Sequence, residues 1–122
     1  ESSDDLAAYD ATLGERIGWK WDAVLAELKQ RGWSPPPGPL LDFGCGSGIA
    51  GRRVLAAFGP ERFTVLRLHD RSPLAEEFSR QQAARTFPQV PQERLGAGEL
   101  ERLEPVGTLV VSHVLGELPE PD

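Results

Sequence analysis

The residues most able to do chemistry are an aspartate and three glycines behind a short apolar run. Residues 40–48 read LLDFGCGSG, in which Asp42 ends an expected strand. Three alternating glycines follow it: Gly44, Gly46 and Gly48. Glycine suits a backbone that turns sharply and approaches a ligand with no Cβ in the way. A strand, a glycine turn and a helix beginning at Ile49 form the first half of a nucleotide-binding βα unit.

The charge of Asp42 favours one class of ligand over another. Residues 46–51 also match G-x-G-x-x-G, the dinucleotide pattern, which places a pyrophosphate on the amides of the helix start. Two like charges about 5 Å apart cost about 3 kcal/mol at an effective dielectric constant of about 20, which disfavours a phosphate beside Asp42. S-adenosylmethionine has no phosphate; its sulfonium and ammonium groups suit Asp42, and its carboxylate suits the amides. The pattern therefore favours S-adenosylmethionine, and a purely structural turn is the alternative.

A second acid follows the next expected strand. Residues 63–68 are rich in β-forming side chains and predict a strand that leads to Asp70. An acid about 20 residues after the glycine turn can accept hydrogen bonds from both ribose hydroxyls. We therefore expect Asp70 to bind the cofactor, with Arg71 beside it. The alternative is that Asp70 only belongs to a helix start in which Ser72 is the N-cap and Pro73 the first helical residue.

Apolar spacing and breaker residues predict the remaining elements. A short helix is expected over residues 6–13, ending near Gly14, and a second helix is expected to end near Arg31, before Gly32. The apolar stripe of the second helix comprises Ile17, Trp21, Val24, Leu25 and Leu28. A helix follows the glycine turn as far as Gly59-Pro60, and another follows Ser72. Residues 88–94 read as a loop, a weak third strand begins at Leu95, and residues 108–111 form a fourth strand. We expect Trp19 and Trp33 to pack in the core or a lid.

Strands that alternate with helices predict a mainly parallel sheet, whose carboxyl edge binds ligands. Glu99 at that edge is a candidate adenine contact, or simply the start of a solvated helix. Ser112 ends the fourth strand and is a further candidate cofactor contact. Beside it, His113 is the candidate catalytic base, although methyl transfer often needs only a positioned nucleophile. We place Cys45 at the cofactor as a small side chain between two glycines, rather than as a nucleophile.

Composition excludes several other classes. The 122 residues make one domain at most, and an apolar content of 39% can support a core. A net charge of −6 without a basic stripe disfavours nucleic-acid binding by this segment alone. A single cysteine excludes an internal disulfide and a cysteine-cluster metal site, and neither histidine has a partner at metal-site spacing. No run has transmembrane length, and no signal peptide is visible.

Two stretches of the sequence resemble known protein families. Residues 41–48 resemble motif I of class I S-adenosylmethionine-dependent methyltransferases. Residues 108–119, TLVVSHVLGELP, are similar to the fourth-strand region of the mitochondrial small-ribosomal-subunit methyltransferase-like family, which has bacterial members. In that family a hydrophobic strand is followed by Val-Leu-x-Glu-Leu, matched here by Val114, Leu115, Glu117 and Leu118.

The resemblance implies a Rossmann-like methyltransferase fold linked to small-subunit rRNA or ribosome assembly. It assigns the methionine end of the cofactor to Asp42, Gly44, Gly46 and Gly48, and the ribose to Asp70. It also implies that some members act as non-catalytic assembly factors. We expect a cytoplasmic protein, with a mitochondrial location as the alternative.

The expected organisation is an N-terminal helical segment over residues 1–33 and part of a cofactor-binding domain over residues 34–122. The chain begins at Glu1, contains no methionine and ends soon after the fourth expected strand. We therefore expect the amino-terminal half of a longer methyltransferase, inactive as a fragment. Three functions stay open: methylation of rRNA or a ribosomal component, methylation of a small molecule, and non-catalytic ribosome assembly.

Overall fold

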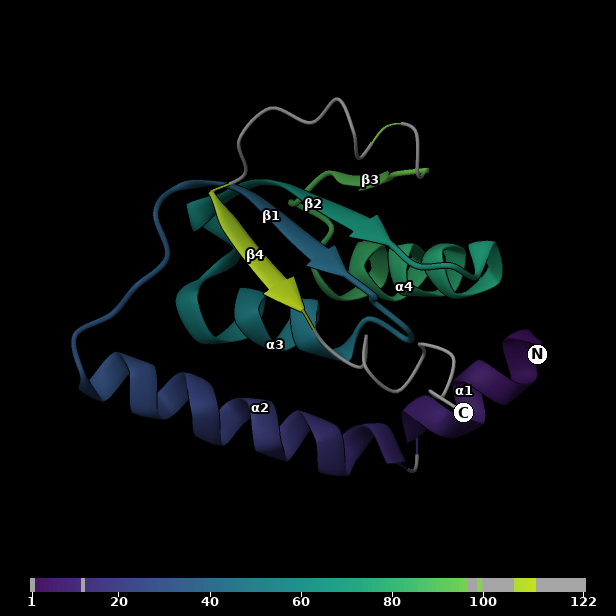
Figure 1. Ribbon diagram of the computed structural model, residues 1–122, viewed down its shortest axis with the longest axis horizontal. Helices are drawn as coiled ribbons and strands as arrows, with labels where there is room; N and C mark the ends of the chain where they lie inside the picture. The colour runs from purple at the N-terminus through teal and green to yellow at the C-terminus, as the bar shows by residue number, and fades with distance from the viewer. Residues whose placement is uncertain (1, 12, 97–98, 100–106, 112–122) are drawn as a thin grey trace, which may run out of the picture.

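A parallel sheet with helices packed against it forms the core of the computed structural model, which describes residues 2–11, 13–96, 99 and 107–111 (Figure 1). Within these residues the strand order is β3-β2-β1-β4, and every pair is parallel. The strands are β1 (Gly38–Phe43), β2 (Phe63–His69), β3 (Gln92–Arg94) and β4 (Thr108–Val111). The helices are α1 (Ser3–Ala11), α2 (Leu13–Gln30), α3 (Ile49–Phe58) and α4 (Pro73–Thr86), with a 3₁₀ turn over Pro60–Arg62. The predicted α/β class and parallel sheet are confirmed.

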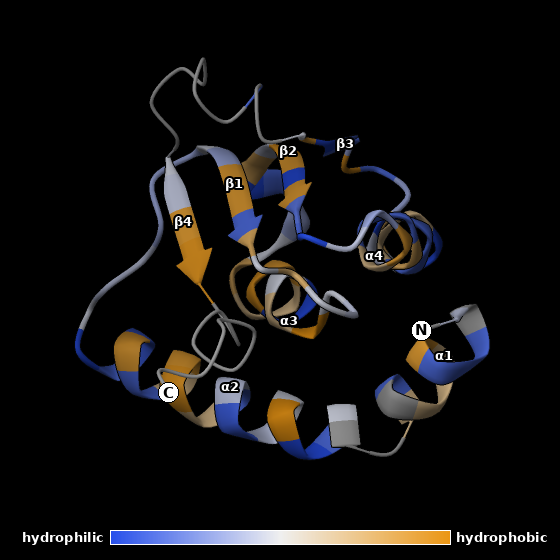
Figure 2. Cartoon of the chain, turned by 45° about the vertical axis from the view of Figure 1, so that its right-hand side comes forward, coloured by the Kyte–Doolittle hydropathy of each residue, from blue (hydrophilic) through white to orange (hydrophobic). Residues whose placement is uncertain are grey.

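The main core lies between the sheet and the helices α3 and α4 (Figure 2). Leu40 of β1 and Leu66 of β2 are side by side in the register and face Val54 of α3 in one buried cluster. Ala83 of α4 and Leu25 of α2 belong to the same cluster. Helix α2 packs on α3, and α1 packs on α2 and α4. This packing places the turn between β1 and α3 at the carboxyl edge of the sheet.

Local signals set several element ends correctly. The amide of Gly32, with φ at 84°, donates to the carbonyl of Lys29, and the amide of Trp33 donates to that of Leu28, so a left-handed glycine ends α2 as predicted. Ser72 accepts from the amide of Ala75 at 3.1 Å as the N-cap of α4. Strand β2 begins at the predicted residue and runs one residue further, and β4 has the predicted bounds.

The third strand was predicted wrongly. Residues 88–94 were expected to be a loop before a strand at Leu95, but β3 covers Gln92–Arg94 and ends before Leu95. Its residues are polar because it pairs on one side only within the described sheet, with β2. The buried side chains Val90 and Leu95 flank it and hold it in place. A polar strand between two buried residues gives no alternating pattern to read.

The helix boundary at Gly14 and two side chains also differ from expectation. Helix α1 ends at Ala11, and Gly14 lies inside α2, where it is buried. Trp19 is 62% exposed, so it does not pack in the described core, and Val24 is 50% exposed. Trp33 contacts Phe58 edge to face, with ring centroids 5.4 Å apart. Helical spacing identified the buried or half-buried stripe of α2 at Ile17, Trp21, Leu25 and Leu28, but it wrongly included Val24.

No helix among the described residues is long and apolar enough to cross a membrane.

Candidate functional site

The glycine turn, residues 44–48, leads from β1 into α3. Three of its residues have the positive φ that glycine tolerates: Gly44 (70°), Gly46 (55°) and Gly48 (89°). The amides of Gly44 and Cys45 donate to the carbonyl of His69 at 2.8 and 3.0 Å. The turn is therefore fixed to the end of β2, directly before Asp70.

Asp42 lies beneath this turn and is fully buried. Its Oδ2 accepts a hydrogen bond from the amide of Gly51 at 3.1 Å, and its Oδ1 has no partner among the described residues. Burial raises the pKa of Asp42 from 3.8 to about 7; the Gly51 hydrogen bond and the Arg52 charge lower it, and the Asp70 charge raises it further. Asp42 is therefore a poorly solvated carboxyl group that is partly protonated near neutral pH.

Asp70 binds the glycine turn from the other side. Its Oδ2 accepts from the amide of Gly46 at 2.9 Å, across 24 residues of sequence. Its Oδ1 accepts from the amide of Ser72 at 2.9 Å, at the start of α4. The carboxylate thus belongs to the helix start, as the cap alternative required, and also touches the turn. The helix-start reading of Asp70 thus has a counterpart in the structure, and its ribose role stays a prediction.

Cys45 is buried between the two acids. Burial raises the pKa of its thiol well above the usual range, and the charges of Asp42 and Asp70 raise it further. The thiol therefore stays protonated at neutral pH. This suits a small packing side chain and argues against a nucleophile, as the sequence suggested.

A hollow of about 690 Å³ opens beside Asp70 at the same edge. Arg71 and Glu99, both expected near the cofactor, line it with Asp70, and Arg94 closes another part. The volume is typical of small-molecule sites, which run from about 300 to 1,000 Å³. The structure therefore gathers the glycine turn, Asp42, Asp70, Arg71 and Glu99 at one edge of the sheet. Two further candidates, Ser112 and His113, lie outside the described residues.

Sequence reasoning missed two buried polar residues of α4, Glu76 and Ser79. Glu76 accepts from the amide of Asp70 at 2.9 Å and pairs with Arg94 at 3.4 Å. A Cβ built at Gly48 would overlap the hydroxyl of Ser79, so Ser79 lies directly against the glycine turn. Both lie at helical spacing among buried apolar residues, and polar residues on such a face were the available signal.

Two solved structures that are similar to this chain are methyltransferases. A proposed S-adenosyl-L-methionine-dependent methyltransferase of Methanococcus maripaludis matches with a TM-score of 0.63 at 13% identity, over 97% of this chain and 52% of its own. Magnesium protoporphyrin IX methyltransferase of Synechocystis, solved with bound S-adenosylmethionine, matches with a TM-score of 0.58 at 23% identity, over 85% of this chain and 49% of its own. The fold is that of S-adenosylmethionine-dependent methyltransferases.

This chain spans about half the length of these two structures. The sequence matches no family profile and no curated protein. Neither structural likeness points to the ribosomal family expected from residues 108–119.

Proposed function

We propose that this chain binds S-adenosylmethionine and forms the cofactor-binding part of a methyltransferase. The observation that carries the proposal is the pairing of two buried carboxylates with backbone amides of the turn and of the first turn of α3. Asp70 accepts from Gly46 and Asp42 accepts from Gly51. Both amides belong to the G-x-G-x-x-G run on which a dinucleotide would rest.

These hydrogen bonds favour a cationic ligand over a phosphate. A pyrophosphate at the turn would compete for amides that carboxylates already hold, and would face the charges of both Asp42 and Asp70. A sulfonium or ammonium group placed there instead gains attraction from the same charges. The Oδ1 of Asp42, which has no partner among the described residues, fits such a ligand, because a nearby cation offsets the cost of a buried, incompletely paired carboxylate.

Each part of the site then has a task in holding the cofactor. In this proposal Asp70 accepts hydrogen bonds from ribose hydroxyls in the hollow that it lines together with Arg71 and Glu99. Asp42 supplies negative charge under the cationic end. When bound, S-adenosylmethionine supplies a methyl group on a positively charged sulfur, ready for a nucleophile. Positioning that nucleophile is the task left to the rest of the site.

The identity of the methyl acceptor is a separate part of this proposal. The resemblance of residues 108–119 supports small-subunit rRNA or a ribosomal component. The likeness to a magnesium protoporphyrin methyltransferase favours a small-molecule acceptor as the second candidate. The net charge of −6 also favours the second, since phosphate binding needs clustered Lys and Arg. The third candidate, a non-catalytic assembly factor, would keep the cofactor site without transfer. The cytoplasmic location also stays a prediction.

Calorimetry tests the cofactor. We expect S-adenosylmethionine and S-adenosylhomocysteine to bind with saturable heats, and NAD to give none at matched concentrations. Saturable NAD binding without S-adenosylmethionine binding would overturn the proposal.

Methyl transfer is then assayed with labelled cofactor in the full-length protein. Small-subunit rRNA and a pool of small aromatic and tetrapyrrole acceptors are compared. Label in rRNA supports the ribosomal acceptor, and label only in small molecules supports the second candidate. Cofactor binding with no transfer to either favours the assembly factor.

A further inference from the structure

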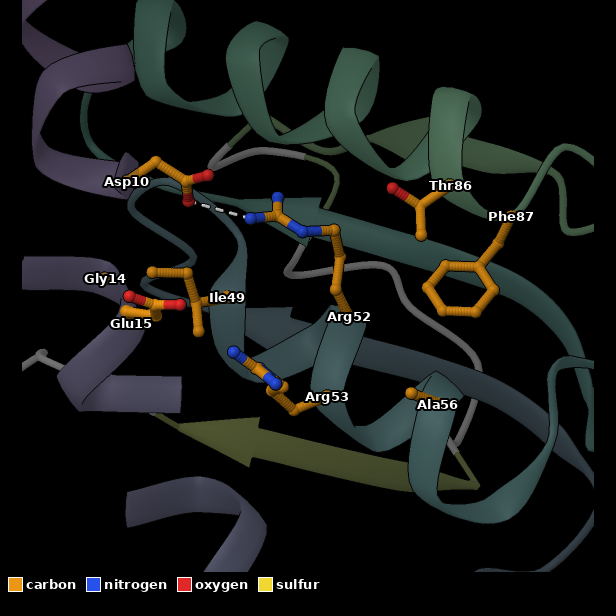
Figure 3. Close-up of a pocket in the computed structure, with 9 residues that line it drawn as sticks. All are labelled: Asp10, Gly14, Glu15, Ile49, Arg52, Arg53, Ala56, Thr86 and Phe87. Atoms are coloured by element: carbon orange, nitrogen blue, oxygen red, sulfur yellow. Dashed lines mark hydrogen bonds and ion pairs between the residues drawn. The ribbon is translucent and has the colours of Figure 1, made fainter. Parts of the chain in front are cut away.

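Arg52 of α3 connects the glycine turn to α1, which is distant from both in sequence. It is the fourth residue of α3, and its side chain is 14% exposed. One terminal nitrogen donates to the carbonyl of Ser47 in the glycine turn at 2.7 Å. The other donates to Oδ1 of Asp10, in α1, at 2.8 Å. Figure 3 shows Arg52 reaching from α3 to Asp10.

Apolar packing holds the other end of α1. Leu6 is buried with Ala75 and Phe78 of α4, in a small cluster separate from the main core. Between α1, the start of α2 and α3 lies a hollow of about 250 Å³, lined in part by Asp10, Gly14 and Arg52 (Figure 3). Beside this hollow, the Asp10–Arg52 pair is a polar link between α1 and α3, and the same guanidinium continues the link to the turn at Ser47.

The Arg52 guanidinium also acts on the acid beneath the turn. Its charge lowers the pKa of Asp42, which burial raises. The other groups that bear on the pKa of Asp42 are the amide of Gly51 and the carboxylate of Asp70. Arg52 is the cation among them, so its loss would leave Asp42 less ionised at neutral pH.

We propose that Arg52 is a positioning residue that couples the glycine turn to helix α1, so that cofactor binding at the turn and docking of α1 strengthen each other. The inference rests on the proposed function for the identity of the ligand. Arg52 acts on the ligand through the Ser47 carbonyl and through the charge of Asp42. By linkage, a contact that favours binding when α1 is docked must favour docking when ligand is bound.

The adjacent arginine supplies a matched control. Arg53 pairs with Asp22 of α2 at 3.1 Å, in a geometry similar to that of Arg52 with Asp10. This pair is more exposed, with 35% of the Arg53 side chain and 48% of the Asp22 side chain accessible to solvent. Among the described residues, Arg53 donates to Asp22 and not to the glycine turn. Asp10→Asn and Asp22→Asn therefore each remove one helix-to-α3 ion pair, but only the first acts on the turn.

Hydrogen exchange of the free protein tests the link without any ligand. Asp10→Asn is expected to speed exchange in α1 and in the amides of residues 44–48, and Asp22→Asn is expected to leave the turn unchanged. Equal effects of the two variants on the turn would overturn the proposal. Because no ligand is present, this result is independent of whether the cofactor is S-adenosylmethionine.

Calorimetry with S-adenosylmethionine tests the coupling. Asp10→Asn is expected to weaken binding by about fivefold to tenfold, and Asp22→Asn by less than about twofold. The cofactor is expected to slow exchange in α1 of the wild type and to do so less in Asp10→Asn. Binding of equal strength in both variants, with no cofactor effect on α1, contradicts the coupling. Absence of binding by the wild type contradicts the proposed function instead.

The pH profile separates positioning from a merely structural role. Arg52→Gln removes the positive charge and is expected to shift the midpoint of binding to higher pH. Arg52→Lys keeps the charge but cannot make both hydrogen bonds, so it is expected to keep the wild-type midpoint and to bind more weakly. The same midpoint in Arg52→Gln as in wild type would contradict the electrostatic part.

Discussion

Gly51 lies directly against Asp42. The Gly51 amide donates to Oδ2 of Asp42 at 3.1 Å, and a Cβ built on Gly51 would lie 2.7 Å from the same oxygen. The third glycine of the G-x-G-x-x-G run therefore makes room for a buried carboxylate. This contact gives the third glycine of the dinucleotide-like pattern a structural role that needs no dinucleotide.

The first prediction is that Gly51→Ala destabilises the protein. Helix propensity alone predicts a gain of about 1 kcal/mol, but the new Cβ meets a buried group that cannot move freely, at a cost of about 1–3 kcal/mol. Gly18→Ala in α2 is the control, since its Cβ would meet only the flexible end of Arg53. Denaturant unfolding should show Gly51→Ala below wild type and Gly18→Ala near or above it. A gain in stability for Gly51→Ala would refute the prediction.

The second prediction concerns pH and Asp42. Its folded-state pKa of about 7 lies above the ordinary 3.8, so the folded protein holds an extra proton between these values. This group's contribution to the free energy of unfolding therefore falls as pH rises from about 4 to about 7, and stays low above. The free energy of unfolding of Asp42→Asn, measured relative to wild type, should therefore rise by about 2–3 kcal/mol from pH 5 to pH 8. The same variant should lose cofactor affinity. A difference independent of pH would show that Asp42 keeps an ordinary pKa.

The third prediction separates the ribose role of Asp70 from its turn role. Asp70 also accepts from the amides of Gly46 and Ser72, so a simple loss of affinity would not distinguish the two. We compare S-adenosylhomocysteine with its 2′-deoxy analogue by calorimetry. Wild type should bind the analogue about tenfold more weakly, whereas Asp70→Asn should discriminate much less. Equal discrimination by both proteins would leave Asp70 as a turn residue only.

The fourth prediction concerns Glu76, which supports Asp70. Glu76 accepts from the amide of Asp70 and pairs with Arg94 while 8% of its side chain is exposed. Glu76→Gln should cost about 1–3 kcal/mol in unfolding free energy and weaken cofactor binding. The control is Glu77→Gln, whose pair with Arg80 is 32% and 37% exposed, and it should cost less than about 1 kcal/mol. Similar losses of unfolding free energy in the two variants would show that burial does not strengthen the interactions of Glu76.

The fifth prediction is that Cys45 does not react in the folded protein. The thiol is 2% exposed, and its pKa is raised by burial first and by two nearby carboxylates second. Iodoacetamide at pH 8 should label Cys45 only after denaturation, as read by mass spectrometry. Rapid labelling of the native protein would indicate an open, ionised thiol.

Interactions between residues close in sequence made much of this fold predictable. The glycine turn, the Ser72 cap and the Gly32 stop depend on residues only a few positions apart, so their types and spacing were sufficient. The apolar run before Asp42 and the β-forming run of residues 63–68 marked the two central strands. Together these elements predicted the parallel sheet and a ligand site at its edge.

Contacts distant in sequence were decided only by the tertiary structure. The burial that raises the pKa of Asp42, the hydrogen bond from Gly46 to Asp70 and the link from Arg52 to Asp10 join residues that share no local pattern. The polar strand β3 likewise depends on its neighbour β2 and on buried residues at its ends. The sequence by itself determined the glycine turn, the Ser72 cap, the Gly32 stop and the two strands that bring Asp42 and Asp70 to one edge of the sheet. Packing decided which of their charges are buried, because desolvation depends on every element around a group and not on its neighbours in the chain.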